Sequence, residues 1–555
     1  MNKNIKLWSK SYDPWIQEGM EIPNTTISTL IGQTVQKFPD RPAFRFYDLV
    51  WTFAEFSEKA DRFACALNEQ GIQKGDVLAI NLLNSPQYLI AFYGAIKAGV
   101  IVSGLSPLLM KNEITFQLSD LKASAVITFD YLLEDRLADV AVGIESLKLI
   151  IVTALGDFLD RENPSPKAKD LPGIEVKRLE DILSRSPARA PQVDLVPEDI
   201  CVIQYTGGTT GVPKGAVLTH HNWMGMQAQF GMWLDTERGK DVLLCPFPMF
   251  HVAGTFHAMQ GLVFGFTQII IPDPRDLNHI IEQINRYKPT IMGTAPALVT
   301  ILLKEADFRK LDFSGLYYCM CGSAPVPVEK AKELEQVIGS NKLAEVYGLS
   351  ETCSLVSANP RDGVKKVGSI GVPLPATRLS LVDLETGETE VPAGEEGEII
   401  ASGPQIMKGY YHNPEETRIA LREHDGEVWL HTGDVGRMDE DGYFYIVDRI
   451  KDMINVGGYK VFSNEIEQKI SKHPAIDQCA IVGVDHPERP GSELVKLVVV
   501  KGKLYAEKPD EEARQDLLEY CRNHFAPYKV PKIVEFVEEI PLTRVGKVNK
   551  KALRH

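Results

Sequence analysis

The chain has 555 residues, of which 44% are apolar, and a formal net charge of -15 at pH 7. This composition indicates a globular protein, and the acidic balance argues against a nucleic-acid backbone as its main partner, because such backbones bind dense Lys/Arg surfaces. The eight cysteines are irregularly spaced, which indicates the reduced thiols of a cytoplasmic protein rather than a disulfide framework. Cys319 and Cys321 form a CxC without nearby histidines, so two buried strand thiols are expected there rather than metal ligands.

The first part of the chain alternates helical and strand-like segments. Residues 52–55 have the spacing of a capping box, and apolar residues then recur at helical intervals until Gly71. Strand-like runs and one further helical stretch follow at 77–80, 86–98 (helical), 100–102, 125–128, 149–152, 201–204, 268–271 and 343–346. This alternation predicts an α/β fold with doubly wound sheets.

One segment, 242–272, contains no Asp, Glu, Lys or Arg. It is long enough to span a bilayer, but prolines, glycines and two histidines interrupt it, which a lipid-facing helix rarely tolerates. We therefore expect a buried core segment that is apolar enough to line a ligand tunnel, and no transmembrane helix. The start of the chain lacks an apolar core of signal-peptide length, so export is not expected either.

Towards the C-terminus the sequence changes character twice. Over 371–410, short runs broken by Pro and Gly predict an antiparallel, β-barrel-like region. A charged cluster at 448–452 then precedes a new and smaller α+β pattern. We predict a large N-terminal domain over residues 1–448, a hinge over 449–452 and a small, mobile α+β domain over 453–555.

The loop 205–215, YTGGTTGVPKG, is suited to holding phosphates. Glycines let main-chain N–H groups approach an anion, hydroxyls add donors, and a lysine adds positive charge. The residues concerned are Thr206, Gly207, Gly208, Thr209, Thr210, Gly211 and Lys214. The common P-loop is excluded, because GxxxxGK[ST] requires a glycine before the lysine, where Pro213 stands.

Five stretches match one superfamily in order: this loop, YGLSET (347–352), TGD (432–434), DRIKDMI (448–454) and VGK (545–547). The chain resembles the adenylate-forming enzymes, and most of all bacterial fatty-acyl-CoA synthetases, through IQYTGGTTGVPKGAVLTHHN, WLHTGDVGRMDEDGYFYIVDRIKDMI and YKVPKIVEF. The resemblance runs from about Ile22 to the C-terminus. It implies that a carboxylate attacks the α-phosphate of ATP to give acyl-AMP and pyrophosphate, after which the thiol of CoA displaces AMP.

The resemblance also implies roles at the phosphates. The glycine-rich loop with Lys214 would wrap the β- and γ-phosphates, and Glu351 would place a carboxylate on Mg2+ with an oxygen from Thr206. Lys547 would reach the α-phosphate and stabilise the adenylation transition state. Lys547, Glu351 and Lys214 are therefore the expected catalytic residues.

For the rest of the nucleotide, Tyr347 offers a flat face to adenine and Asp434 can accept hydrogen bonds from the ribose hydroxyls. Arg449 would face the ribose or the α-phosphate. By the resemblance, the nucleotide is bound further by Gly322, Ser323, Ala324, Gly348 and Ile446.

One site must serve two different attacks, so the resemblance implies that the small domain rotates about a hinge at Lys451. Rotation would withdraw Lys547 and present Gly457, Gly458 and Tyr459 beside a tunnel for the pantetheine arm of CoA. The acyl group is expected at Phe250, His251, Val252, Gly254 and Thr255, with His251 as a gate. Some long-chain family members carry a gating tryptophan just after this histidine. This chain has no tryptophan at that place.

The resemblance favours a fatty acid of medium or long chain as the substrate. Because the gating tryptophan is missing, alicyclic and aromatic acids also remain open. ATP, Mg2+ and CoA are the expected cofactor and co-substrates, and a monomer or homodimer with peripheral membrane contact at most is expected. Two alternatives remain: an acyl-AMP ligase that loads a carrier protein, and a non-catalytic acyl- or nucleotide-binding relative. The direction of the reaction is undetermined by the sequence.

Overall fold

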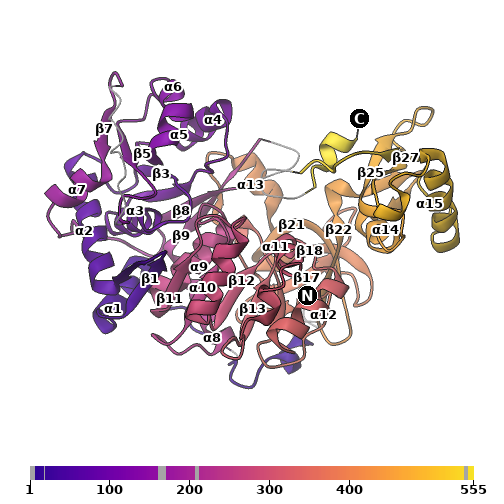
Figure 1. Cartoon of the computed structure of the whole chain (residues 1–555), viewed down its shortest axis with the longest axis horizontal. Helices are drawn as coiled ribbons and strands as arrows, with labels where there is room; N and C mark the ends of the chain where they lie inside the picture. The colour runs from indigo at the N-terminus through magenta and orange to yellow at the C-terminus, as the bar shows by residue number, and fades with distance from the viewer. Residues whose placement is uncertain (1–6, 18, 160–170, 207–211, 543–547, 555) are drawn as a thin grey trace.

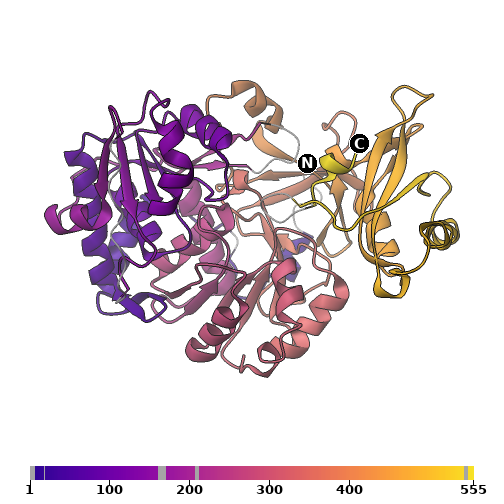
Figure 2. The same cartoon turned by 45° about the horizontal axis from the view of Figure 1, so that its top comes forward.

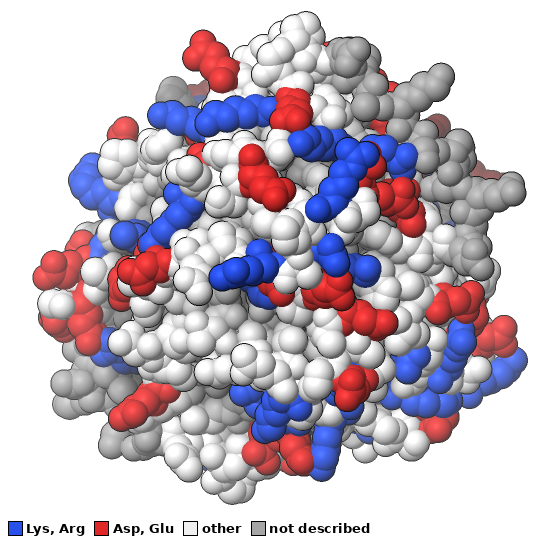
Figure 3. Space-filling view, turned by 90° about the vertical axis from the view of Figure 1, so that its left-hand side faces the viewer, with Lys and Arg blue, Asp and Glu red and all other residues white. Residues whose placement is uncertain are grey.

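A computed structural model describes residues 7–17, 19–159, 171–206, 212–542 and 548–554. Figure 1 and Figure 2 show a large body built from two mixed α/β layers and an antiparallel sheet, with the C-terminal elements projecting from one side. On the face shown in Figure 3, Lys and Arg alternate with Asp and Glu, and neither sign covers a continuous area.

The first α/β layer is an eight-stranded sheet. Its central strands run parallel, while β9 is antiparallel to β8 and β19 is antiparallel to β9. In spatial order the strands are β19 (Gly409–Tyr410), β9 (Gly215–Thr219), β8 (Ile200–Tyr205), β4 (Ile101–Gly104), β3 (Val77–Asn81), β5 (Ala125–Phe129), β6 (Leu149–Thr153) and β7 (Glu175–Arg178). The phosphate-type loop therefore joins two antiparallel neighbours, β8 and β9, rather than a strand and a helix.

The second α/β layer is a nine-stranded sheet with a parallel centre and antiparallel strands at both edges. In spatial order its strands are β16 (Val372–Pro373), β15 (Ser357–Ala358), β14 (Leu343–Tyr347), β13 (Tyr318–Cys321), β12 (Ile291–Thr294), β10 (Val242–Cys245), β11 (Thr267–Ile270), β1 (Pro42–Phe46) and β2 (Leu49–Thr52).

The helices pack against these sheets and against each other. Those of the body are α1 (Ile27–Lys37), α2 (Phe53–Glu69), α3 (Pro86–Lys97), α4 (Lys111–Leu121), α5 (Asp130–Leu132), α6 (Ala138–Ala141), α7 (Leu179–Arg185), α8 (His220–Leu234), α9 (Val252–Phe264), α10 (Leu277–Tyr287), α11 (Pro296–Leu302), α12 (Val328–Ile338) and α13 (Pro414–Ala420). The predicted capping box is present at α2, where the Thr52 N–H donates to the Glu55 carboxylate at 2.8 Å and the Glu55 N–H donates to the Thr52 hydroxyl at 3.2 Å.

The body also contains an antiparallel sheet, and two of its five strands come from the Pro/Gly-broken region 371–410 that predicted it. Its strands are β17 (Arg378–Val382), β18 (Glu396–Ser402), β21 (Glu427–Met438), β20 (Leu421–His424) and β22 (Phe444–Arg449). The short 3-10 turn η5 (Ile450–Asp452) leads from β22 into the C-terminal elements.

The C-terminal elements are a hairpin, a three-stranded sheet, two helices and a last 3-10 turn: β23 (Ile454–Val456), β24 (Tyr459–Val461), α14 (Ser463–Ile470), β25 (Ile476–Asp485), β26 (Glu493–Lys501), α15 (Asp510–His524), β27 (Ile533–Phe536) and η7 (Lys550–Leu553). They enclose an apolar core of their own, with Ile454, Ile466, Leu497 and Leu517 all fully buried.

The charge-free segment 242–272 forms β10, α9 and β11, and most of its residues are buried, as predicted. Among the described residues, none of the helices combines the length and the apolarity needed to cross a membrane. Cys319 and Cys321 are buried free thiols on β13, which also confirms the prediction.

Candidate functional site

Three of the sequence motifs meet at the carboxylate of Asp434. The Tyr347 hydroxyl, at the end of β14, donates to one carboxylate oxygen at 2.6 Å, and Nε of Arg449 lies 2.9 Å from the other. Asp434 and Arg449 are register partners on β21 and β22, so the antiparallel pairing itself sets the ion pair. The Asp434 side chain is only 3% exposed, whereas that of Arg449 is 40% exposed. The cluster is therefore buried at the carboxylate and open at the guanidinium.

The electrostatics of this cluster keep its charge pattern fixed. Burial, reinforced by the charge of Asp434, raises the pKa of Tyr347 well above its ordinary value, so the phenol stays protonated and donates. The Asp434 carboxylate raises the pKa of Arg449, whose guanidinium stays charged. A carboxylate has about four lone-pair positions, so Asp434 retains acceptor capacity for two further donors such as ribose hydroxyls.

A second cluster surrounds the lysine of the glycine-rich loop. Lys214 forms an ion pair with Glu416 at the first turn of α13, and its ammonium lies 5.2 Å from the ring centroid of Tyr410. The Tyr410 hydroxyl donates in turn to the Glu351 carboxylate at 2.7 Å. Burial and the charge of Glu351 raise the pKa of Tyr410, so this hydroxyl also stays a donor. The predicted residues Lys214 and Glu351 thus lie on either side of one tyrosine.

Sequence reasoning missed Glu416 and Tyr410. Glu416 stands 202 residues from Lys214 in the chain and belongs to none of the five motifs. Tyr410 comes to Lys214 because β19 pairs with β9, which begins one residue after the lysine. No local pattern signals either contact, since both depend on a long-range strand pairing.

The rest of the glycine-rich loop is described only at its ends. The Thr206 N–H donates to the carbonyl oxygen of Lys214 at 2.9 Å, which closes the loop as a hairpin. The predicted phosphate ligands Gly207, Gly208, Thr209, Thr210 and Gly211 lie outside the described residues.

The adenine slot predicted at 322–324 follows β13, beside the end of β14. Ser323 has a φ of 70° and is exposed together with Ala324, whereas Gly322 is buried, and a Cβ there would stand 2.9 Å from the Val346 side chain. Gly348 is equally constrained, because a Cβ there would stand 1.8 Å from the Ser354 carbonyl oxygen. The 322–324 loop thus runs close to Tyr347, the residue after Val346.

Ile446 lies on β22 opposite Gly436 of β21 and is half-buried against the main core. It stands three residues before Arg449 on the same strand. The described residues that are predicted to bind adenosine therefore lie at the ends or on the faces of β13, β14, β21 and β22.

A buried carboxylate on β14 also lies near this slot and was not singled out from the sequence. Glu345 is 9% exposed and accepts a 2.6 Å hydrogen bond from the Gly368 N–H and another from the Val326 N–H. Burial outweighs these hydrogen bonds and raises the pKa of Glu345 to about 7. Through these two hydrogen bonds, Glu345 links the loop that begins at Gly322 to the segment around Gly368.

The predicted acyl segment forms the turn into α9. His251 is the N-cap of this helix and accepts a 3.3 Å hydrogen bond from the Ala253 N–H. Thr255 is buried and donates to the Met249 carbonyl at 2.8 Å, and the Phe250 carbonyl accepts from Gln204 of β8 at 3.0 Å. Thr255 and the Phe250 main chain are therefore engaged in holding the turn. Val252 is buried in the main core.

Gly254 is packed tightly, since a Cβ there would stand 2.0 Å from the Pro248 carbonyl oxygen. It is the one member of the predicted acyl set that, among described residues, also lines the small cavity beneath α9.

The predicted hinge is tied to the end of the chain. Lys451 lies in η5, where the pKa of its ammonium is lowered by burial and then by the Arg449 charge. The guanidinium of Arg554 donates to the Lys451 carbonyl at 2.9 Å and lies 3.5 Å from the Asp452 carboxylate. Lys547 lies outside the described residues, but the turn that follows it is thus anchored at the hinge.

Lys550 anchors the same turn to α14. Its ammonium donates to the Ser463 hydroxyl at 2.6 Å and lies 2.9 Å from the Glu467 carboxylate. Ser463 donates to the buried Asp448 carboxylate of β22 at 2.8 Å. A polar chain therefore links β22, the start of α14 and the C-terminal turn.

The residues predicted for CoA lie at the turn of the β23–β24 hairpin. Gly457 and Gly458 have φ of 60° and 92°, and no described atom lies within 4 Å of a Cβ built at either. Tyr459 is 61% exposed and stacks on Tyr528 at 4.6 Å, while Lys460 lies 3.9 Å from Glu385 between β17 and β18. In this arrangement the hairpin faces the antiparallel sheet.

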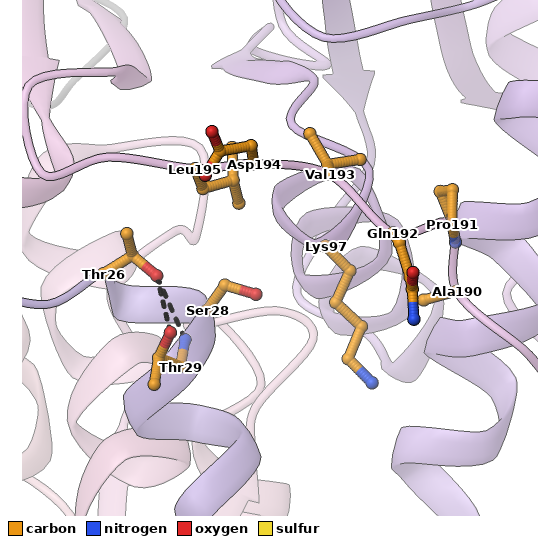
Figure 4. A pocket seen from close by; sticks show the side chains of 10 residues that line it. All are labelled: Thr26, Ser28, Thr29, Lys97, Ala190, Pro191, Gln192, Val193, Asp194 and Leu195. Atoms are coloured by element: carbon orange, nitrogen blue, oxygen red, sulfur yellow. Dashed lines mark hydrogen bonds between the residues drawn. The ribbon is translucent and has the colours of Figure 1, made fainter.

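The pocket of about 650 Å³ in Figure 4 lies elsewhere and contains none of the predicted residues. It is bounded by the start of α1 and the extended segment 190–195. Its one cation, Lys97, is already bonded to Asp61 and, at 3.1 Å, to Ser57. With Lys97 paired and Asp194 as the other charged residue in its lining, this open pocket offers no convergent positive charge to a ligand.

Among the described residues, no group of three or more His, Cys, Asp or Glu side chains could hold a metal ion. Mg2+ however is commonly held by one or two carboxylates together with substrate phosphates. Glu351 fits this pattern, since it is a half-buried carboxylate beside Lys214, and only one of its oxygens accepts from Tyr410.

Two family models match the chain: AMP-binding enzyme over residues 31–411, and AMP-binding enzyme C-terminal domain over residues 465–547. The chain is 38% identical over 572 residues to the long-chain-fatty-acid–CoA ligase of Bacillus subtilis (strain 168), covering 99% of this chain and 97% of that protein. It is 36% identical to the enzyme of the same name from Escherichia coli O6:H1, covering 95% of this chain and 93% of that protein.

Solved structures give the same result. The ATP-bound MatB of Rhodopseudomonas palustris superposes with a TM-score of 0.83 at 28% identity, over 96% of this chain and 98% of that chain. The anthranilate CoA ligase AuaEII in complex with anthranoyl-AMP has a TM-score of 0.81 at 25% identity, over 96% and 97%.

The chain belongs to the AMP-binding enzyme family, and its α/β body with a separate C-terminal core agrees with the two matched parts of that family. Within that family it is an acid–thiol ligase of the AMP-forming type.

Proposed function

We propose that this ligase activates a fatty acid of medium or long chain with ATP and transfers the acyl group to CoA. The observation that carries the proposal is the convergence of Tyr347, Asp434 and Arg449, from three separate motifs, beside the Lys214–Tyr410–Glu351 cluster. The relatives named long-chain-fatty-acid–CoA ligase support the choice of acid. Because ATP and CoA are cytoplasmic metabolites, we expect the reaction in the cytoplasm.

The reaction has two balanced steps. In the first, a carboxylate oxygen of the acid bonds to the α-phosphorus of ATP, and the bond to the β-phosphate oxygen breaks, which releases pyrophosphate. In the second, the CoA sulfur bonds to the acyl carbon, AMP leaves, and the thiol proton passes to solvent. The first step joins two anions, so its main requirements are positioning and neutralisation of charge.

Lys214 is suited to that neutralisation. Its ammonium is 31% exposed and forms an ion pair with Glu416, and a phosphate oxygen of the nucleotide would replace that carboxylate. Glu351 would hold Mg2+ together with substrate phosphates, and the bound ion would neutralise charge that develops on the pyrophosphate. Thr206 at the start of the loop would add an oxygen.

The Asp434 cluster is suited to the nucleoside. The carboxylate would accept from the ribose hydroxyls through its remaining lone pairs, and Arg449, open to solvent on its outer side, would face the ribose or α-phosphate. Tyr347 would stack on adenine, with Gly322, Ser323, Ala324 and Gly348 forming the slot and Ile446 its apolar side.

Domain rotation about Lys451 completes the proposal. Lys547 would act on the α-phosphate in adenylation, and Gly457, Gly458 and Tyr459 would line the path of the CoA thiol after rotation. The exposed, glycine-turned hairpin and its surface contact at Glu385 are suited to a segment that changes neighbours. The acyl chain would lie along Phe250, His251, Val252, Gly254 and Thr255.

The test is pyrophosphate exchange into ATP, measured with carboxylic acids of graded length and ring content, followed by thioester formation with CoA and with carrier proteins. We expect exchange and acyl-CoA formation with fatty acids. Exchange without transfer to CoA, but with transfer to a carrier protein, would identify a carrier-loading ligase instead. Absence of exchange with every acid would identify a non-catalytic relative.

A further inference from the structure

A histidine that none of the motifs contains lies beneath the predicted acyl segment. His257, on α9, is 5% exposed, and its Nδ1 lies 2.7 Å from the Ala253 carbonyl oxygen. A carbonyl only accepts, so Nδ1 carries the proton and Nε2 presents a bare lone pair. No described residue forms a hydrogen bond with Nε2. Burial lowers the pKa of His257 to about 4, so the ring stays neutral near pH 7 and Nε2 stays an acceptor.

This histidine lines a small cavity between α9 and strands β10 and β11. The other polar group in the wall is the amide of Gln268, which is 4% exposed and whose nitrogen also has no partner among the described residues. The Gln268 amide rests against Gly261, one helical turn after His257, since a Cβ at Gly261 would stand 2.3 Å from the amide nitrogen. The two unpaired groups therefore face one side of α9.

The cavity has room for little more than one oxygen atom. Its volume is about 10 Å³, close to the smallest that admits a water-sized group. The remaining wall is formed by apolar side chains and the Cys245 thiol, with the Phe247 ring centroid 6.1 Å from that of His257. Burial raises the pKa of Cys245 to about 12, so the thiol adds no charge.

The cavity adjoins the segment to which the acyl group is assigned. Met249 and Gly254 belong both to the cavity wall and to the Pro248–Phe256 turn. On the proposed acyl path along this turn, a substituent of the chain would lie next to the cavity that His257 lines. An alkyl chain alone leaves the Nε2 lone pair and the Gln268 amide unpaired, which is unfavourable for buried polar groups.

We propose that His257 is a specificity-determining residue and that the acyl site selects carboxylic acids bearing a hydroxyl group on the acyl part. The hydroxyl donates its proton to Nε2 of His257 and accepts from the Gln268 amide, a combination of donor and acceptor that one oxygen provides. The inference rests on the proposed function, because it takes the turn before α9 as part of the acyl site.

The test compares kcat/KM for ω-hydroxy fatty acids of graded length and for a hydroxybenzoic acid, each beside its unsubstituted parent. The wild type should prefer at least one hydroxy acid over its parent by about tenfold or more. His257→Phe should abolish that preference, so that kcat/KM for the hydroxy acid and for its parent become equal within about threefold. Gly293→Ala, whose Cβ would stand 2.7 Å from Nε2, should abolish it in the same way.

Met259→Leu, a volume-conserving change on the same helix within the main core, is the matched control and should keep the preference. The inference is overturned if no hydroxy acid is preferred by the wild type, or if the preference survives in both His257→Phe and Gly293→Ala while both variants remain folded by thermal unfolding. The first result is expected if the two groups merely share a structural water.

Activity on the parent acids keeps this test separate from that of the proposed function. If the wild type forms no thioester with any of the acids, the proposed function is contradicted. Normal turnover of parent acids without a hydroxyl preference contradicts only the role of His257.

Discussion

The hydroxyl of Tyr347 donates a 2.6 Å hydrogen bond to the carboxylate of Asp434, across 87 residues of chain. Tyr347 ends a strand of the second α/β sheet, whereas Asp434 lies on the antiparallel sheet, so this bond fastens two layers at the predicted nucleotide site. If the ring of Tyr347 also stacks on adenine, as proposed, its hydroxyl and its ring have two separable functions.

Replacing the hydroxyl alone separates them. Tyr347→Phe keeps the ring and removes the donor to Asp434, and a hydrogen bond to a charged acceptor contributes about 1.5–3 kcal/mol. We expect the KM for ATP to rise about tenfold or more, with a smaller change in kcat, as measured by pyrophosphate exchange. Tyr445→Phe is the control, because its hydroxyl donates to Asp439 at 3.0 Å, away from this cluster. Equal effects of both variants on KM would contradict the assignment.

The ion pair between Lys214 and Glu416 predicts a gain of affinity on mutation. If Glu416 occupies the phosphate position, Glu416→Gln releases Lys214 for the nucleotide. Both side chains are about one-third exposed, at 31% and 38%, so the gain is limited to about 1 kcal/mol, or two- to fivefold in the dissociation constant of ATP. Titration of nucleotide binding at low and high salt measures it, and the gain should shrink at high salt.

Glu415→Gln gives the same change of charge one residue away, on an exposed side chain in the same helical turn. It should leave ATP affinity within about twofold. A gain of similar size in this control would attribute the effect to net charge rather than to competition at Lys214.

Much of the fold was predictable from the sequence, because its signals are local, and the motifs on which the site prediction depends are local as well. The capping box at Thr52 and Glu55 satisfies backbone donors within one turn, so four residues suffice to predict the start of α2. Strand and helix periodicity likewise predicted β3, α3 and β14, each within a few residues of the observed bounds.

The unpredicted contacts are those that depend on tertiary packing. Glu416, Tyr410 and His257 reach their places through strand pairing and helix burial, and their neighbours in the chain carry no signal of these contacts. The same holds for Glu345, whose environment depends on the chain at Gly368 and Val326.

Glu345 predicts a pH dependence of stability. Its folded pKa of about 7 lies above the unfolded value of 4.5, so protonation favours the folded state. The stabilisation is fully present below pH 4.5 and is lost as the pH rises to about 7. The loss is on the order of 3 kcal/mol.

Glu345→Gln should remove this dependence. The difference in urea midpoint between the variant and the wild type should move in favour of the variant as the pH rises from 4.5 to 7 and stay constant above it. Glu335→Gln, on the partly exposed face of α12, is the control and should show no such trend. A constant difference between Glu345→Gln and the wild type over this range would show that the carboxylate ionises normally.

The proposed rotation about Lys451 predicts that two variants lose opposite half-reactions. Lys547→Ala should lower adenylation, measured by pyrophosphate exchange, by a factor of about a hundred or more. The reason is that the variant removes a positive charge that stabilises the transition state. It should retain most of the transfer of the acyl group from supplied acyl-AMP to CoA.

Lys451→Pro, which restricts the backbone at the predicted hinge, should keep exchange and lose the transfer. Lys503→Pro, at the start of another short 3-10 turn of the C-terminal elements, is the matched control and should keep both. If Lys547→Ala and Lys451→Pro each lowered both half-reactions equally, the small domain would have a single working orientation, and the hairpin at Gly457 and Gly458 would have no separate role in the second step.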